Sequence, residues 1–284
     1  MPTKSLSRTY TLAYSPCPND TYIFAALTNG LLPDVPRVHV HLADIEELNT
    51  AAARAEYELT KVSYGAIPYL MGDYRILRSG GALGRGCGPL VVTRADGPQT
   101  FEDLRGCTVA IPGERTTAFM LLQLALEGRP VTRQMRFDDI VPAVARGDAD
   151  AGLIIHESRF TYSSAGLVAR ADLGEWWESV SGMPIPLGAI LVRNDIDAET
   201  ACVLDNAIRT SLQFSRTHEA EIMPYVRAHA FEMNDDVMRK HIDLYVNDYS
   251  VDVGDDGSAA VTELFDRARR AGILDADATP RFSR

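Results

Sequence analysis

Short apolar runs alternate with segments of helical period along the first two thirds of the chain. Apolar runs bounded by Gly, Pro, Asn or Asp predict strands. The predicted strands are residues 10–14, 38–42, 59–63, 90–93, 108–111, 152–155 and 190–192. Because helical segments lie between them, the alternation favours an α/β protein with mainly parallel sheets and helices on both faces.

Several of the helical segments carry start and stop signals. Asp44 followed by Glu47 is typical of a capping box and predicts the start of a helix. Thr117 precedes a helix predicted over 118–127 and can cap its first turn. The C-terminal third is helical throughout, with helices predicted at 198–217, 219–229, 234–247 and 258–271.

Two strand segments resemble each other, GPLVVTR at 88–94 and PLGAILVR at 186–193. This echo has two readings: a chain that leaves one domain and later returns to it, or two buried strands of a single sheet. We expect residues 1–92 and 192–284 to form a discontinuous first lobe. Residues 93–191 then form an inserted α/β lobe, with the ligand cleft where the chain crosses twice.

The composition is that of an ordinary globular protein. Of 284 residues, 46% are hydrophobic and 24% are charged, so the chain exceeds an average domain and can bury a sizeable core. The net charge of −11 disfavours binding to nucleic acid phosphates, and an anionic ligand needs local donors. No apolar run is long enough to span a membrane, and the first residues lack a signal-peptide pattern. We therefore expect a cytoplasmic protein without nucleic acid or membrane partners.

The four cysteines are scattered along the chain and indicate neither a disulfide framework nor a zinc site. They are Cys17, Cys87, Cys107 and Cys202. No pair of histidines has metal-ligand spacing. We therefore expect chemistry that uses no metal.

A dense cluster of polar residues, SPCPND at 15–20, follows the first predicted strand. In parallel α/β proteins, ligands gather at such strand ends, where helix N-termini present free N–H groups. Asn19, Asp20 and Thr21 can cap the next helix, so a rigid turn with an ordinary cap also explains the segment. Nothing near Cys17 marks it as an activated nucleophile, and we expect it to line the cleft.

Another predicted strand end carries Lys61 and Ser63, which alternate with apolar neighbours and point to one face of the strand. Lys61 can pair with a substrate carboxylate or with an acidic residue at the sheet end, and both readings stay open. The glycine-rich segment 79–90 lacks the Gly-Lys-Ser/Thr ending of a phosphate loop and precedes a strand. It is typical of a flexible connection between domains, in which Arg85 can clamp an anion.

The segment PGERTTAF at 112–119 is a stronger candidate for an anion site. A strand ends at Ile111, a Pro-Gly turn follows, and Thr116 and Thr117 precede an apolar helix. The helix N-terminus offers N–H groups and a favourable dipole beside these hydroxyls. A plain N-cap explains Thr117 but does not explain a second threonine.

His156 is the sharpest single candidate for catalysis. It follows a buried strand predicted over 152–155 and precedes Glu157, so it can reach a cleft at the strand end. The ordinary histidine pKa near 6.5 suits a general base at neutral pH, although a lone histidine is often structural. The other histidines lie on an early strand or on surface-like C-terminal helices: His39, His41, His218, His229 and His241.

Six of these strings resemble one family of menaquinone-biosynthesis enzymes, the 1,4-dihydroxy-6-naphthoate synthases of the futalosine route. The strings are SPCPNDTYIF (15–24), LTKVSYGA (59–66), RSGGALGRGCGPLVV (78–92), PGERTTAF (112–119), AGLIIHESRFTY (151–162) and PLGAILVR (186–193). They occur in order over nearly the whole chain. The resemblance implies the two-lobed fold of type II periplasmic binding proteins, used for catalysis in the cytoplasm.

The resemblance also implies an activity and its residues. It implies a lyase that converts cyclic dehypoxanthine futalosine to 1,4-dihydroxy-6-naphthoate and releases a three-carbon sugar fragment, without metal or organic cofactor. The family's base corresponds to His156. The family's substrate contacts correspond to Lys61, Val62, Ser63, Thr117 and Ala118. From the residues themselves we add three expected contacts to an anionic small molecule: Thr116, Asn19 and Arg85. We expect a monomer or a homodimer.

Two other classes of function compete with this hypothesis. A solute-binding protein or the effector domain of a regulator can share the fold without catalysis. We expect neither, because the sequence before the first strand resembles neither an export signal nor a DNA-binding segment. A transferase that uses the Cys17 thiol is the other alternative, and it predicts that replacing Cys17 with Ser abolishes activity.

Overall fold

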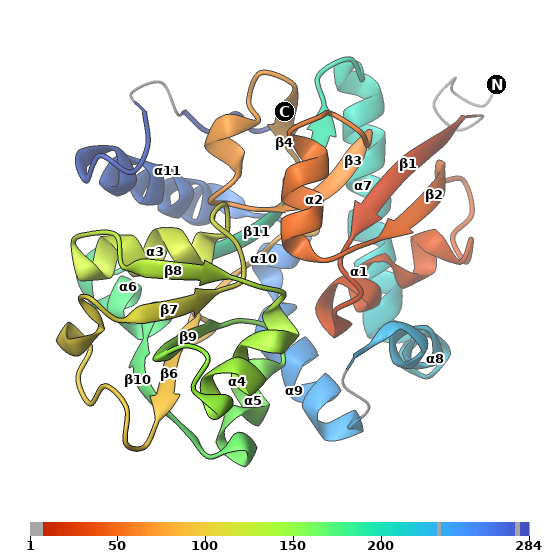
Figure 1. The fold of residues 1–284 in the computed structure, drawn as a ribbon. Helices are drawn as coiled ribbons and strands as arrows, with labels where there is room; N and C mark the ends of the chain where they lie inside the picture. Colours follow the sequence, from red (N-terminus) through yellow and green to blue (C-terminus); the bar gives the residue numbers. More distant parts are fainter. Residues whose placement is uncertain (1–7, 232–233, 276–278, 284) are drawn as a thin grey trace.

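The computed structural model describes residues 8–231, 234–275 and 279–283. Residues 1–7, part of the N-terminal segment considered above for a signal peptide, lie outside this description. The strands form two separate sheets, and helices surround both of them (Figure 1). Within the described part of the chain, no helix has the length and apolar character needed to cross a membrane.

The first sheet has the order β2-β1-β3-β11-β4, and β5 also pairs with β11. Its strands are β1 (Thr9–Tyr14), β2 (Arg37–Leu42), β3 (Leu59–Ser63), β4 (Tyr74–Ile76), β5 (Ala82–Gly84) and β11 (Ile185–Arg193). β1 runs parallel to β2 and β3, whereas β11 runs antiparallel to β3, β4 and β5.

The second sheet has the order β10-β6-β9-β7-β8. Its strands are β6 (Leu90–Arg94), β7 (Thr108–Ile111), β8 (Val131–Gln134), β9 (Ala151–Ile154) and β10 (Leu167–Asp172). β7 runs parallel to β8 and β9, whereas β6 runs antiparallel to β9 and β10. The prediction of mainly parallel sheets is therefore wrong. Both sheets are mixed because each contains one strand that follows a passage of the chain from the other sheet. These strands are β6 and β11, and each runs antiparallel to the neighbouring strands of its sheet.

The two segments that echo each other lie in different sheets. β6 belongs to the second sheet and β11 to the first, so they are not two strands of a single sheet. The chain passes between the sheets after β5 and returns before β11, which begins inside the predicted inserted lobe. The division into lobes 1–92 with 192–284 and 93–191 stays a prediction.

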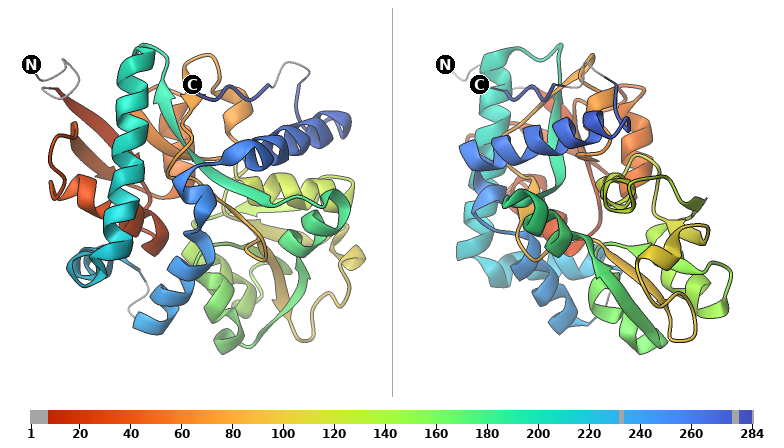
Figure 2. Two further views of the ribbon diagram at one scale, coloured as in Figure 1. Left: turned by 180° about the vertical axis from the view of Figure 1, so that it is seen from behind. Right: turned by 90° about the vertical axis from the view of Figure 1, so that its left-hand side faces the viewer.

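The helices cover the outer faces of the sheets and fill the C-terminal third. They are α1 (Pro18–Thr28), α2 (Ile45–Ala52), α3 (Thr117–Leu126), α4 (Phe137–Arg146), α5 (Ser158–Thr161), α6 (Leu173–Ser181), α7 (Ala198–Thr217), α8 (Glu219–His229), α9 (Asp235–Tyr245), α10 (Asp248–Val251) and α11 (Gly254–Arg270). The predicted bounds of α7 and α8 are confirmed. Figure 2 shows α7 and α11 on the same side of the molecule, the side that faces away from the viewer in Figure 1.

Two predicted helix caps differ in detail from the structure. The Asp44 side chain caps α2 by accepting from the backbone N–H of Glu46, so Glu47 does not complete a capping box there. In α3 the cap is Thr116, whose side chain accepts from the N–H of Phe119. Thr117 is therefore the first helical residue, and its hydroxyl serves another purpose.

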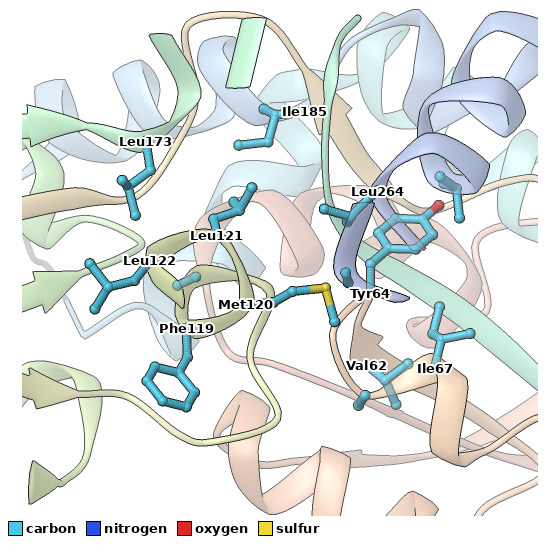
Figure 3. Close-up of a cluster of buried hydrophobic side chains, with 14 of the residues drawn as sticks. Val62, Tyr64, Ile67, Phe119, Met120, Leu121, Leu122, Leu173, Ile185 and Leu264 are labelled. Atoms are coloured by element: carbon cyan, nitrogen blue, oxygen red, sulfur yellow. The ribbon is translucent and has the colours of Figure 1, made fainter. Parts of the chain in front are cut away.

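A large apolar cluster joins the two sheets. It includes Val62 of the first sheet, Tyr64 directly after β3, Leu121 of α3 and Leu173 of α6. Leu264 of α11 packs into the same cluster, and α11 contacts both α3 and β11. In Figure 3, Leu121 of α3 points toward Ile185, and Met120 of the same helix points to the other side, toward Tyr64. The two sheets are thus held together on this side by one continuous core.

Candidate active site

A cavity between the two sheets collects most of the predicted site residues. Its empty volume, with the open mouth included, is about 630 Å³. The polar and ionisable residues of its lining are Ser15, Asn19, Asp20, Lys61, Ser63, Thr116, Thr117, His156, His241 and Tyr245, with the thiol of Cys87 among the mostly apolar remainder.

Lys61 reaches the cavity as one half of a buried ion pair. Its Nζ lies 2.6 Å from Oδ1 of Asp20, and both side chains are almost fully buried. Lys61 also donates to the backbone oxygen of Gly80 at 3.3 Å. The Asp20 carboxylate accepts two further hydrogen bonds, from Ser15 and Asn19, each at 2.8 Å. Lys61 was expected to pair either with a substrate carboxylate or with an acidic residue. In the structure it pairs with the acidic residue Asp20, so the pair brings little net charge to the cavity.

The residues after β1 that were predicted to cap the next helix do not do so. The helix already begins at Pro18, with Cys17 as the N-cap residue, because a proline suits the first helical position. Asn19, Asp20 and Thr21 thus lie in the first turn rather than before it. Oδ1 of Asn19 is buried and has no hydrogen-bond partner among the described residues. Asn19 can therefore accept a hydrogen bond from a ligand hydroxyl.

The alternation of β3 sorts its three expected contact residues onto opposite faces. Lys61 and Ser63 line the cavity, whereas the fully buried side chain of Val62 belongs to the apolar cluster. Asn49 fixes the strand end by accepting from the N–H of Ser63 at 2.9 Å. Gly188 on β11 faces Ser63, and a Cβ there would lie 3.0 Å from Cε of Lys61. A glycine at this position therefore leaves room for the lysine stem.

The N-terminus of α3 ties the two sheets together at the cavity. The Thr117 hydroxyl donates to the backbone oxygen of Leu187 at 2.7 Å and accepts from the N–H of Gly65 at 3.1 Å. A Cβ on Gly65 would lie 2.7 Å from the backbone oxygen of Thr116, so this approach requires glycine. The second threonine is thus explained, since Thr116 caps the helix while Thr117 joins it to the first sheet. Ala118 lines the cavity beside them.

His156 follows β9 in an unusual backbone conformation. Its φ is +56°, a left-handed value that is uncommon for residues other than glycine and that often occurs at functional sites. The ring lies edge-on to Phe137, with centroids 5.0 Å apart. Its Nε2 is buried and finds no hydrogen-bond partner in the part of the chain that the structure describes. This nitrogen is therefore available to a ligand.

The structure adds a second histidine that the sequence reading assigned to a surface-like helix. His241 on α9 is 1% exposed and lines the cavity. Burial, and then Coulomb interactions with His156 and Lys61, hold the pKa of His241 well below its ordinary value. The signal for it was present, because His241 lies three residues after Met238 and four before Tyr245, on the buried stripe of the helix.

Arg85 lies away from the other predicted residues. Its side chain is 53% exposed, donates to the backbone oxygen of Gly182 and pairs with Glu178 at 3.5 Å. The structure therefore does not bring Arg85 into the cavity lining. Arg159 stabilises the segment that connects β5 to β6, by donating to the backbone oxygen of Gly88 at 2.6 Å.

Among the described residues, one group combines side chains that could hold a metal ion. Ligand atoms of Cys17, His156 and Glu157 lie within 4.8 Å of one another. Burial, and then the charge of Glu157, raise the pKa of the Cys17 thiol well above its ordinary value. The thiol is therefore protonated and a poor nucleophile. A metal ion held here would occupy the imidazole that general-base chemistry needs.

Comparison with known proteins gives a consistent family. A family model described as menaquinone biosynthesis matches residues 10–270. A curated relative from Thermus thermophilus, named 1,4-dihydroxy-6-naphtoate synthase, is 47% identical over 271 residues, which cover 95% of this chain and 98% of the relative.

Solved structures show the same architecture. A crystal structure of an Archaeoglobus fulgidus protein is 33% identical, covers 94% of this chain and 98% of its own, and gives a TM-score of 0.88. The periplasmic aliphatic sulphonate binding protein of Escherichia coli gives a TM-score of 0.66 at 12% identity, covering 95% of this chain and 89% of its own. At that identity the likeness shows the fold alone. The expected α/β fold of the periplasmic-binding-protein type is confirmed.

Proposed function

Because the chain belongs to the menaquinone-biosynthesis family that includes a named 1,4-dihydroxy-6-naphthoate synthase, we propose that it converts cyclic dehypoxanthine futalosine to 1,4-dihydroxy-6-naphthoate and releases a three-carbon sugar fragment. The proposal rests on the cavity between the sheets and on His156, which lines it and has a left-handed backbone conformation. Nε2 of His156 is buried and has no hydrogen-bond partner among the described residues.

His156 acts as the general base. Opening the cyclic substrate toward an aromatic diol requires removal of a proton and cleavage of a carbon–carbon bond, with aromatisation as the driving force. A neutral imidazole can take that proton at neutral pH, and its Nε2 needs no rearrangement to do so. The left-handed backbone at φ +56° fixes the direction in which the ring leaves the chain.

The substrate carboxylate binds at the start of α3. Asp20 neutralises Lys61 at 2.6 Å, so the lysine adds little net positive charge. The Thr116 cap already accepts from the N–H of Phe119, so the anion lies beside the N–H groups of Thr117 and Ala118, where the helix dipole favours it. The third ammonium proton of Lys61 can then donate to a substrate hydroxyl, with Ser63 beside it.

The contact between the sheets helps to exclude water from the reaction. The Thr117 hydroxyl bridges to Leu187 and Gly65, so α3 closes one side of the cavity while it presents its N-terminus to the ligand. Exclusion of water strengthens the electrostatic contacts of the remaining donors. The site therefore needs only a few local donors to hold an anion, despite the net charge of −11.

The test is incubation of the protein with cyclic dehypoxanthine futalosine, with the naphthoate product followed by absorbance and mass. We expect turnover by the wild type and a loss of about 10²–10⁴-fold in His156→Asn. The matched control is His218→Asn, an exposed histidine away from the cavity. Turnover by His156→Asn at the wild-type rate would refute the base role. Binding of the substrate by folded wild-type protein without any product would favour a solute-binding or regulatory module instead.

A further inference from the structure

Two imidazoles, rather than one, face the cavity. His156 extends from the end of β9, and His241 extends from α9 beside it. We propose that His241 is a second substrate-contacting residue, which donates a hydrogen bond to the substrate oxygen that gains negative charge while His156 removes the proton. The inference rests on the proposed function and adds a residue to its machinery.

The geometry keeps the two rings from satisfying each other. Their centroids lie 6.3 Å apart and their planes are inclined by only 27°. Since ring N–H groups and nitrogen lone pairs lie in the plane of an imidazole, stacked rings at this distance cannot form a hydrogen bond with each other. Within residues 8–231, 234–275 and 279–283, neither ring nitrogen of His241 has a hydrogen-bond partner. A ligand in the cavity can supply the missing partner.

The surroundings of His241 keep it neutral. The aromatic rings of Tyr245 and Phe160 pack against it, with centroids 4.6 Å and 6.3 Å away. The groups that act on it electrostatically are His156 and Lys61, and a charge on either one disfavours protonation of His241. Burial is the largest cause of its lowered pKa. A neutral imidazole carries one N–H donor, and it can stabilise a developing oxyanion without competing with His156 for the substrate proton.

A purely structural role would be served better by another residue. A buried polar group without a partner destabilises the fold, whereas a phenylalanine would fill similar space without that cost. A contact with substrate therefore predicts an unusual result for His241→Phe: the melting temperature stays equal or rises while turnover falls. A structural role predicts that stability and turnover fall together.

The first experiment compares His241→Phe with the matched control His218→Phe. His218 is exposed, stacks on Phe214 and is not part of the cavity lining. With cyclic dehypoxanthine futalosine we expect kcat of His241→Phe to fall by about 10²–10³-fold, the loss typical of one oxyanion donor, and the control to keep its kcat. His241→Gln should recover part of the loss, because its amide restores an N–H donor.

Wild-type turnover by His241→Phe would overturn the inference. If the wild type itself makes no naphthoate, the proposed function fails instead, so the two failures are distinguishable. A second measurement needs no variant: nitrogen NMR of histidine-labelled wild type, titrated with 1,4-dihydroxy-6-naphthoate. We expect His241 to be neutral at pH 7 and its donor nitrogen to shift on binding. An unmoved His241 signal at saturation would also overturn the inference.

Discussion

Burial has opposite effects on the proton affinity of two side chains beside the cavity. It raises the pKa of Cys17 and lowers the pKa of His241, because desolvation disfavours the charged form of each group. Both side chains are therefore neutral at physiological pH. Neutrality makes the thiol inert and leaves the imidazole with one donor and one acceptor.

An inert thiol predicts that Cys17→Ser retains activity. The thiolate is the reactive form of cysteine, and the raised pKa of Cys17 keeps its population low. Iodoacetamide should therefore alkylate the exposed Cys202 well before Cys17, as read by peptide mass spectrometry. A Cys17→Ser variant that folds but makes no product would restore the thiol-transferase alternative.

The lowered pKa of His241 predicts a pH dependence of stability. Below the unfolded pKa of about 6.5, the unfolded chain binds a proton that the folded protein excludes, so folded stability falls as the pH falls. His241→Phe should lose this contribution, whose slope is at most about 1.4 kcal/mol per pH unit. Urea unfolding of both proteins between about pH 5 and 8 measures the difference. Parallel curves would show that His241 is protonated in the folded state.

At the scale of elements, the Lys61–Asp20 pair joins β3 to α1 inside the protein. Replacing Lys61 with Met leaves a buried carboxylate unpaired, and we expect unfolding free energy to fall by about 3–5 kcal/mol. The double variant with Asp20→Leu should recover much of that loss, because no isolated charge remains. Urea denaturation measures both.

The matched control for this pair is Arg54→Met. Its partner is Glu56, both side chains are exposed, and such surface pairs contribute less than about 1 kcal/mol. Equal losses in Lys61→Met and Arg54→Met would contradict the prediction, since they would mean that burial adds nothing to the cost of an unpaired charge.

Element by element, the sequence predicts the strongly apolar strands and the amphipathic C-terminal helices well. The bounds of β3 and β7 are as predicted. β11 is longer than predicted because Pro186 and Gly188 interrupt its apolar run. β8 was missed because it is an exposed edge strand, with Val131 57% exposed, and therefore lacks an apolar face. In strands that are this short or this exposed, the alternation of apolar and polar residues is too weak to be recognised.

The same limit applies to the site. Strand-end position was enough to single out Lys61, Thr117 and His156, all of which line the cavity. Sequence could not say which charge pairs with Lys61, because Asp20 reaches it only through the packing of α1 on the sheet. His241 was missed because its helix was taken as surface-like, although the helical spacing of Met238, His241 and Tyr245 already placed it on the buried stripe.

At the scale of the whole molecule, the apolar cluster that spans both sheets predicts one cooperative unfolding transition. Trp176 and Trp177 both lie on α6, so tryptophan fluorescence reports the packing around that helix, whereas far-UV circular dichroism reports the whole chain. Urea curves from the two probes should coincide.

The variant that tests this coupling is Leu264→Ala on α11. The side chain is fully buried in the shared cluster, so its removal should cost about 2–5 kcal/mol and shift both curves equally. The exposed Thr262→Ala, on the same helix, should shift neither by more than about 0.5 kcal/mol. Separation of the two curves would mean that the part of the protein around α6 unfolds independently of the rest.

The position of β11 in the sequence affects how the protein folds during its synthesis on the ribosome. β3, β4 and β5 all pair with β11, yet residues 85–184 must be synthesised before β11 exists. At ~5–20 residues per second, the nascent chain carries those strands with open edges for roughly 5–20 s. All strands of the second sheet lie between Leu90 and Asp172, so that sheet can form during the delay. The half of the molecule that is made first is thus the half that is completed last.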